Sequence, residues 1–362
     1  MKVKLGDIFE IGSGGTPSKG HSEYYGGNIP WVKTGDLKTT YLYNVEDYIT
    51  EDGLNNSSAK IYEPDTVLIA MYGATIGATS ILKIDACTNQ ACAAFKPNNK
   101  VKPEYLYYFL RSKRNKFIND GVGGAQPNIS AGYLKKVSME LPILEKQKEI
   151  IDVLNRIVAV IEMRKQELIK LDDLIKARFV ELFGDPEIGT CNYSLRRLGD
   201  LSNKISDGVH AKPEYVEDGR PFLSVVNINK RKVDFTECKY VSEEAYQKMI
   251  KSTHPEKGDV LYTKVGATYG IPAYVDTDIE FCLYVSVCLI KPKHDEINAR
   301  FLALQMDMPF IKHQADSRIK GIGVPDLHLN QIREFLIICP PREMQNKFVL
   351  FVEQVDKSKF VA

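Results

Sequence analysis

The sequence lacks the common signatures of an enzyme active site. It has no GxxxxGK[ST] phosphate loop, no HExxH pair and no GxSxG elbow, which argues against the best-known nucleotide hydrolases, zinc proteases and serine hydrolases. It also has no Asn-Pro-Pro-aromatic or Asp-Pro-Pro-aromatic tetrad, the segment with which amino-methyltransferases hold a flipped base. We therefore expect a recognition scaffold without catalytic residues.

Cysteine, histidine and long apolar runs are also sparse. The seven Cys form no CxxC and the six His show no metal-ligand spacing, which argues against a disulfide framework or a metal site and favours a reducing cytosol. No apolar run reaches the ~18 residues that span a bilayer, and MKVKLGDIFEIG at the N-terminus lacks the apolar core of a signal peptide. We expect a cytoplasmic chain with no membrane contact, and the net charge of +1 leaves room only for a local basic face.

What the sequence does contain is a long internal repeat. YGATIG at 72–77 recurs as VGATYG at 265–270, and LGD at 5–7 recurs at 198–200, both with an offset of 193 residues (265 − 72; 198 − 5). Later matches keep the same order, and their offset rises only to 198. The chain is therefore a tandem duplication of a unit far longer than a solenoid repeat.

Each unit begins with a globular part of mixed strands and short helices. Turn signals bound six strand-like runs, at 66–73, 91–95, 137–141, 259–266, 284–291 and 334–339. A helix is predicted over 103–118, where Pro103 suits the first turn, with a counterpart near 296–313.

Each unit ends in a helix of coiled-coil type. No Pro or Gly occurs over 144–183, and apolar residues recur every seven positions from Leu154 to Leu182, which predicts a heptad seam. Forty helical residues would span roughly 60 Å, and the Gly-Asp-Pro at 184–186 ends the run. An amphipathic helix lying on a globular core is the alternative interpretation.

The predicted organisation follows from these patterns. The fold is expected to be α+β, with two tandem-duplicated recognition domains separated by long coiled-coil helices. The first domain covers 1–142 and its helix 143–184; the second domain covers 185–340, and a short, truncated second helix covers 341–362.

Two polar loops in the first unit have the composition of a ligand-binding surface. The segment 12–27 is rich in Gly and Ser and also carries Lys, His and Tyr, so its backbone and side chains could donate hydrogen bonds to phosphates. A flexible surface loop is the alternative. The segment 121–132 follows a basic helix with Arg111 and Arg114, and carries Gln126 and Asn128, whose amides suit an adenine edge. Asn128 could instead cap the following turn.

The second unit keeps these loops but changes their tips. Its segment 318–329 retains the Gly and Pro positions and replaces the amides with Lys320 and Asp326. The Gly-Ala-Thr segments are predicted to be tight turns whose rims could reach a ligand. We predict DNA contacts from Ser13, Thr16, Ser18, Lys19, His21, Tyr24, Lys33, Tyr72, Thr75, Gln126, Asn128, His210, Lys212, Asn227, Lys264, Thr268, Tyr269 and Lys320.

Taken together, these elements resemble the specificity subunits of type I restriction–modification systems. The resemblance rests on LGDIFEIGSGGTPS, IPWVKTGDLK, GATIG, the helix start at 141–150, ELFGDP and the segment at 341–348, in this order and duplicated along the whole chain. It implies that each globular part reads one half of a bipartite target in duplex DNA. It also implies that the helices set the gap and dock two adenine-methylating modification subunits.

The resemblance also implies that the chemistry lies in other subunits. S-adenosylmethionine would be bound by the modification subunits, and ATP with Mg by restriction and translocase subunits, so no cofactor is expected on this chain. The short second helix departs from the family pattern and predicts an exposed seam, covered by a modification subunit, a second copy or a half-subunit. The alternatives are an inactive decoy specificity chain and a fragment of a fused restriction–modification enzyme.

Overall fold

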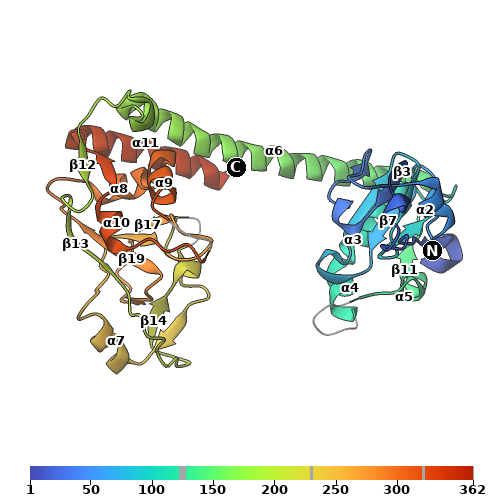
Figure 1. The fold of residues 1–362 in the computed structure, drawn as a ribbon, viewed down its shortest axis with the longest axis horizontal. Helices are drawn as coiled ribbons and strands as arrows, with labels where there is room; N and C mark the ends of the chain where they lie inside the picture. Colours follow the sequence, from blue (N-terminus) through green and yellow to red (C-terminus); the bar gives the residue numbers. More distant parts are fainter. Residues whose placement is uncertain (122–127, 229–230, 320–322, 362) are drawn as a thin grey trace. The chain divides into compact units, whose positions relative to one another are not determined.

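The computed structural model describes residues 1–121, 128–228, 231–319 and 323–361. By its contacts the chain separates into two units, Met1–Glu162 and Met163–Ala362. Each unit is a compact α+β body, and a single long helix contributes its first half to unit 1 and its second half to unit 2 (Figure 1). Within the described residues, no helix is both long and apolar enough to cross a membrane.

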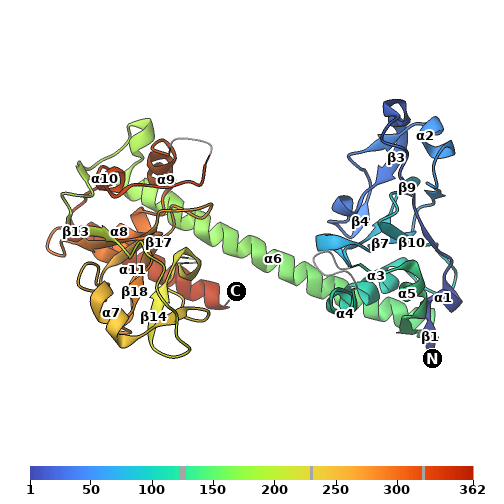
Figure 2. The ribbon, with the colours of Figure 1, turned by 60° about the horizontal axis from the view of Figure 1, so that its bottom comes forward.

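Unit 1 is built on two mixed sheets and a short strand pair. The pair is β1 (Lys2–Lys4) with β11 (Ser138–Glu140). The first sheet has the order β2 (Ile11–Ser13), β10 (Cys92–Phe95), β7 (Val67–Ala70), β8 (Thr79–Leu82), β4 (Tyr41–Leu42); the second has the order β5 (Tyr48–Ile49), β3 (Tyr25–Val32), β9 (Ala86–Thr88), β6 (Ile61–Tyr62). Its helices are α1 (Leu5–Ile8), α2 (Glu51–Asn55), α3 (Pro103–Ser112), α4 (Arg114–Asp120) and α5 (Ala131–Lys136). Figure 2 shows α2 with β3 at one end of this unit and α3, α4 and α5 at the other.

Unit 2 repeats this plan. Its strand pair is β12 (Leu195–Arg197) with β20 (Leu336–Ile338). Its larger sheet has the order β13 (Ser202–Asp207), β19 (Val287–Pro292), β16 (Val260–Thr263), β17 (Pro272–Tyr274), and its smaller sheet the order β15 (Lys239–Val241), β14 (Arg220–Leu223), β18 (Cys282–Leu283). Its helices are α7 (Glu243–Met249), α8 (Ala299–Gln305), α9 (Pro309–Asp316), α10 (Leu329–Arg333) and α11 (Arg342–Val361).

The predicted duplication is confirmed at the level of strand pairing. In unit 1 the parallel pair β3–β9 sets Trp31 opposite Cys87, and in unit 2 the parallel pair β14–β18 sets Phe222 opposite Cys282. The central antiparallel series β2-β10-β7-β8 corresponds to β13-β19-β16-β17. All six predicted strands are present within the predicted segments or one residue beyond them. Two copies of one topology therefore carry two different sets of surface side chains.

The single helix predicted over 103–118 is wrong, because the structure breaks it into α3 and α4 at Lys113. Lys113 has φ −96° and ψ 0°, which ends α3. In unit 2 the break between α8 and α9 has a covalent cause, because Pro309 lacks an N–H and forces Met308 into an extended conformation. Both breaks turn a second short helix toward the sheet, where Phe117 and Phe310 are buried.

The long helix α6 (Leu144–Phe183) has the predicted bounds. Its end coincides with Gly184, whose φ of +78° suits glycine. In unit 2, Phe179 and Phe183 pack with Phe348 of α11, with ring centroids 5.4 and 5.7 Å apart. Figures 1 and 2 both show α11 lying along the second half of α6. The second helix therefore fills the seam from Leu171 to Leu182. The expectation that the short second helix leaves the seam exposed from Ile161 to Leu182 is wrong for this part and holds only around Ile161 and Leu168, which are exposed.

A buried glutamine fixes the first turn of each long helix. The side chain of Gln147 accepts a hydrogen bond from the Lys102 N–H at 2.9 Å and donates to the Lys100 carbonyl at 2.9 Å. In unit 2, Gln345 accepts from the Asn298 N–H at 2.7 Å and donates to the Pro340 carbonyl at 2.9 Å. Gln147 thus ties α6 to the segment before α3, and Gln345 ties α11 both to the segment before α8, through Asn298, and to the chain just before α11, through Pro340.

Replacing Gln345 with Ala should destabilise unit 2 by about 2–3 kcal/mol, because the partly buried Asn298 N–H and the buried Pro340 carbonyl lose their partner. The matched control is Gln354→Ala on the exposed face of α11, which should change stability by less than about 0.5 kcal/mol. Urea unfolding followed by circular dichroism measures both. Equal unfolding midpoints for the two variants would contradict the stabilising role of Gln345.

Candidate nucleic-acid interface

The two Gly-Ala-Thr segments form corresponding hairpin turns. In unit 1 the turn joins β7 to β8, and Gly73 and Gly77 have φ of +65° and +78°. In unit 2 it joins β16 to β17, and Gly266 and Gly270 have φ of +89° and +91°. Only glycine adopts these angles without strain, so the repeated sequence is explained by the backbone of the turn.

Each turn lies against the second polar loop of its own unit. In unit 1, Tyr72 forms an isolated β-bridge with Asn128, and in unit 2 Val265 forms the corresponding bridge with Asp326. The turn and the loop therefore make one polar edge in each unit, and this edge carries different side chains in the two units. Tyr72 is 44% exposed, so its ring is available to a ligand at this edge.

The glycine-rich segment 12–27 is packed, which contradicts the alternative of a flexible loop. A Cβ on Gly14 would lie 1.8 Å from the Thr88 carbonyl oxygen. The indole N–H of Trp31 donates to the Gly15 carbonyl at 3.0 Å. The first part of the segment is thus held against β9, while Ser13, Ser18, Lys19 and His21 are exposed.

Several of the predicted contact residues in unit 1 have intramolecular partners. The His21 ring lies 2.7 Å from a Glu23 carboxylate oxygen and stacks on Tyr24. Lys33 pairs with Asp47 at 2.5 Å. Of the other predicted residues, Thr16 hydrogen-bonds to Gln90 and the Thr75 hydroxyl donates to the Tyr72 carbonyl, whereas Asn128 is exposed. The helix cap weighed for Asn128 is supplied by Ser130, whose hydroxyl accepts from the Tyr133 N–H at 3.1 Å.

Two residues of unit 2 that we predicted to contact DNA are buried and bonded inside the unit. The Lys264 ammonium is buried, 3.2 Å from Asp326 and 3.6 Å from Asp207. Asn227 is also buried; its side chain accepts from the Ser224 N–H and donates to the Asp234 carbonyl. Both side chains are satisfied inside the unit, and a ligand would have to displace these partners.

The other predicted residues of unit 2 lie at its surface. Thr268 is exposed, and Tyr269 is half-buried with its hydroxyl bonded to Asp316. His210 is exposed with Asp207 at 3.6 Å, and Lys212 lies over the Tyr215 ring. The predicted contacts Gln126 and Lys320 lie outside the described residues, so they stay predictions.

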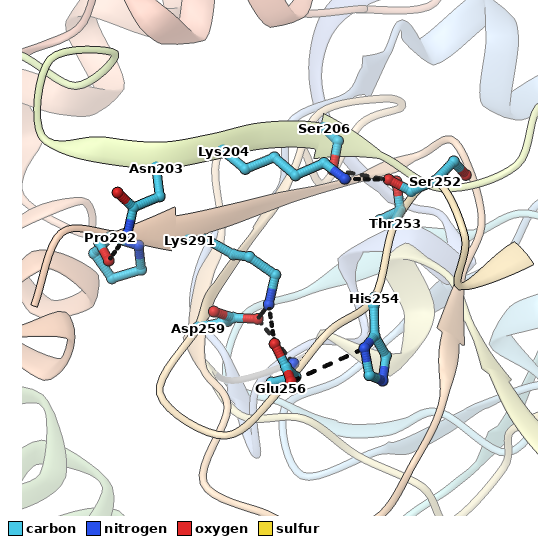
Figure 3. Close-up of polar contacts among 10 residues, drawn as sticks. All are labelled: Asn203, Lys204, Ser206, Ser252, Thr253, His254, Glu256, Asp259, Lys291 and Pro292. Carbon is cyan, nitrogen blue, oxygen red and sulfur yellow. Dashed lines mark hydrogen bonds and ion pairs between the residues drawn. The ribbon is translucent and has the colours of Figure 1, made fainter.

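A network of polar side chains fastens the segment 250–259 of unit 2 to its larger sheet. The Thr253 hydroxyl donates to the Asp207 carbonyl at 2.6 Å. The Lys204 ammonium donates to the Ser252 carbonyl (Figure 3). The Lys291 ammonium bridges the Asp259 and Glu256 carboxylates, each at 2.7 Å. These contacts fasten the segment 250–259 to β13 and β19 and so fix the end of β13, where Asp207 lies.

Burial and pairing shift the acidity of the two carboxylates in opposite directions. Burial raises the pKa of Asp259, against the hydrogen bonds from Lys291 and the Glu256 N–H. The hydrogen bond from Lys291 lowers the pKa of Glu256 below its ordinary 4.5. The stabilisation from Glu256 is therefore present above its ordinary pKa and is lost as the pH falls through the lowered value.

Replacing Lys291 with Met should destabilise unit 2 by about 3 kcal/mol, because the buried Asp259 carboxylate loses its cation. The control is Lys248→Met, which removes an exposed pair with Glu244 in the same unit and should cost less than about 1 kcal/mol. Chemical denaturation at neutral pH compares the two. A Lys291 variant as stable as the control would contradict the supporting role of the network.

Sequence reasoning missed three features of these surfaces. It did not select Asp207 or Asp326, whose importance comes from Lys264 lying between them. It also left Lys38, together with the noted Arg111 and Arg114, outside the set of contact residues. Arg111 and Arg114 lie in a run without acidic residues from Tyr105 to Asn119, which could have drawn attention to them, whereas Lys38 follows Asp36 by two residues and carries no such signal. Within the described residues, no group of His, Cys, Asp and Glu is arranged to hold a metal ion.

Comparisons with known proteins agree on one family. The family described as "Type I restriction modification DNA specificity domain" matches residues 1–172 and 192–360. The chain is 27% identical over 379 residues to the type I restriction enzyme MjaIX specificity subunit of Methanocaldococcus jannaschii, covering 97% of this chain and 85% of that one. It is 19% identical over 367 residues to the EcoKI specificity subunit of Escherichia coli, covering 90% and 75%.

A solved structure shares the fold. Its title is "Structural basis underlying complex assembly and conformational transition of the type I R-M system"; its TM-score to this chain is 0.64 at 17% identity, and the match covers 100% of this chain and 91% of that one. At this identity the likeness concerns the fold alone.

Proposed function

Because the chain belongs to the type I restriction–modification DNA specificity family, we propose that each of its two units reads one half of a bipartite DNA sequence. Unit 1 and unit 2 would each present the edge formed by the Gly-Ala-Thr turn and the polar loop to base edges. The two half-sites would differ, so the full target would be asymmetric.

The observation that carries this proposal is the pair of equivalent edges with unlike side chains. The bridge of Tyr72 with Asn128 in unit 1 corresponds to that of Val265 with Asp326 in unit 2. The backbone geometry is shared, whereas an aromatic ring and an amide are replaced by an aliphatic side chain and a carboxylate. Amides and carboxylates select different base edges, so one scaffold would read two sequences.

The long helix α6 would serve as spacer and docking surface. Its residues 155–170 are exposed, and Ile157, Ile161 and Leu168, which share one face of the helix, are 49%, 50% and 37% exposed. An apolar stripe of this size marks an interaction site. We assign it to the adenine-methylating modification subunits, which would bring S-adenosylmethionine; ATP and Mg would belong to the restriction subunits, and this chain would perform no catalysis.

The half-site assignment predicts separable effects on specificity. Tyr72→Ala should relax base choice in one half of the selected sequence, and His210→Ala should affect only the other half. The change per altered position should be about 1–3 kcal/mol. Selection from a random duplex library by the assembled methyltransferase, followed by sequencing, reads both halves. If either substitution changed both halves, the assignment of one unit to one half-site would be wrong.

If the modification subunit binds the apolar stripe of α6, a charged residue within the stripe should disrupt that binding. Ile161→Glu should abolish co-purification with the modification subunit, since it places a carboxylate in the apolar stripe. The matched control is Ala159→Glu, also exposed but on the opposite face of α6. Equal co-purification of the two variants would sink the assignment. If Ile161→Glu instead converted a dimer of this chain into a monomer, the stripe would belong to a second copy.

A further inference from the structure

A hollow without acidic side chains lies beside the Gly-Ala-Thr turn of unit 1. It has a volume of about 430 Å³, and its lining includes Lys38, Gly77, Tyr107, Arg111, Arg114 and Asn115. The walls come from the turn itself, from α3 and α4, and from the segment before β4. No Asp or Glu contributes to its lining.

The three cations of the hollow have no acidic partner. Lys38, Arg111 and Arg114 are exposed, and no carboxylate of the described chain lies within 4.0 Å of their charged nitrogens. The other basic residues at this surface are often paired, as Lys33 is with Asp47. Three uncompensated cations around one hollow attract an anion.

Each guanidinium group is held in place by one hydrogen bond, and that of Arg111 also lies over the Tyr107 ring. Arg111 donates to the hydroxyl of buried Tyr107 at 2.6 Å, and that hydroxyl lies 3.0 Å from the Thr40 hydroxyl. Arg114 donates from Nε to the Ile76 carbonyl at 3.3 Å. Both terminal nitrogens of Arg114 and Nη2 of Arg111 therefore remain for a ligand, in an orientation already set by the protein.

Gly77 makes the position of Arg114 possible. A Cβ at this residue would lie 2.7 Å from Cγ of Arg114, and its φ of +78° disfavours any other residue. The turn and the arginine stem are thus in direct contact. The hollow therefore adjoins the end of the Gly-Ala-Thr turn, at Gly77.

In unit 2 a cation likewise packs against the second glycine of the Gly-Ala-Thr turn, but this cation is paired with a carboxylate. Gly270 takes the place of Gly77, and Lys312 approaches it, with Cδ 3.1 Å from a Cβ added there. However, the Lys312 ammonium lies 2.6 Å from Asp316 and 3.4 Å from the centre of the Tyr269 ring. The unit 2 counterpart therefore provides a matched control within the same chain.

We propose that the hollow lined by Lys38, Arg111 and Arg114 binds a phosphodiester group of the DNA backbone, and that the corresponding place in unit 2 does not. The guanidinium fork suits two phosphate oxygens, and such contacts set the register of a protein on the duplex without reading bases. The proposal rests on the function proposed above, and it adds that unit 1 has a backbone clamp that unit 2 lacks.

The test measures DNA affinity of the assembled methyltransferase over a range of salt concentrations. The double variant Arg111→Gln with Arg114→Gln should lose at least about tenfold in affinity, equally on target and unrelated duplexes. The slope of log affinity against log salt should fall by about 1–2. Lys312→Gln should leave both the affinity and the slope unchanged. An unchanged double variant, or an equal loss in Lys312→Gln, would overturn the clamp.

Neutral methylphosphonate linkages, placed one at a time, locate the phosphate. One linkage in the half-site read by unit 1 should weaken the wild-type complex and have no further effect in the double variant. The absence of any such coupled linkage overturns the proposal. If the double variant fails to fold, Lys38→Gln, at an exposed position, should show the same coupling at the same linkage, and its absence would overturn the clamp.

Two further arms separate the remaining outcomes. Inorganic phosphate, titrated at constant ionic strength, should compete only weakly with DNA. If the wild-type complex bound phosphate and the double variant did not, while the double variant kept its DNA affinity, the hollow would be a site for a free anion and the proposed phosphodiester contact would be wrong. Failure of the wild-type complex to favour any duplex sequence would refute the proposed function. The methylphosphonate coupling on any bound duplex would still decide the clamp.

Discussion

The anchoring of α6 at both of its ends is the constraint on which the rest of the molecule depends. In unit 1 the buried Gln147 ties the first turn to the segment before α3, and in unit 2 Phe179 and Phe183 pack into the core with Phe348. Between these anchors the helix has neither Pro nor Gly, and its residues 156–170 are exposed. A continuous helix can serve as a spacer only if each of its ends is fixed in its own unit. The two anchors would meet this condition.

Within each unit, the duplicated scaffold separates backbone geometry from side-chain identity. The glycines that form the turns recur because their positive φ angles are needed in both copies. The side chains on the resulting edge are free to differ, and the buried group of Lys264 with Asp207 and Asp326 shows how far they have diverged from unit 1. Under the proposed function, stability and recognition would thus depend on different residues of the same hairpin.

Much of the fold could be predicted from the sequence because it depends on local pattern. The heptads gave the bounds of α6, and the repeated glycines gave the turns. The break at Lys113 could not be predicted, since no Pro or Gly marks it and it depends on burying Phe117. The burial of Lys264 could not be predicted either, because its carboxylate partners come from distant parts of the chain. The sequence could therefore place these loops at the surface, but it could not show which of their side chains have partners inside the unit.

The most direct test of the account is a methylome. This chain would be co-expressed with its modification subunit in a host free of DNA methylation, and N6-methyladenine would be mapped at single-base resolution. The account predicts an asymmetric motif of two different half-sites separated by a fixed gap. A palindromic motif would mean that only one unit reads DNA, and no methylation by an assembled complex would mean that neither does; either result would contradict the account.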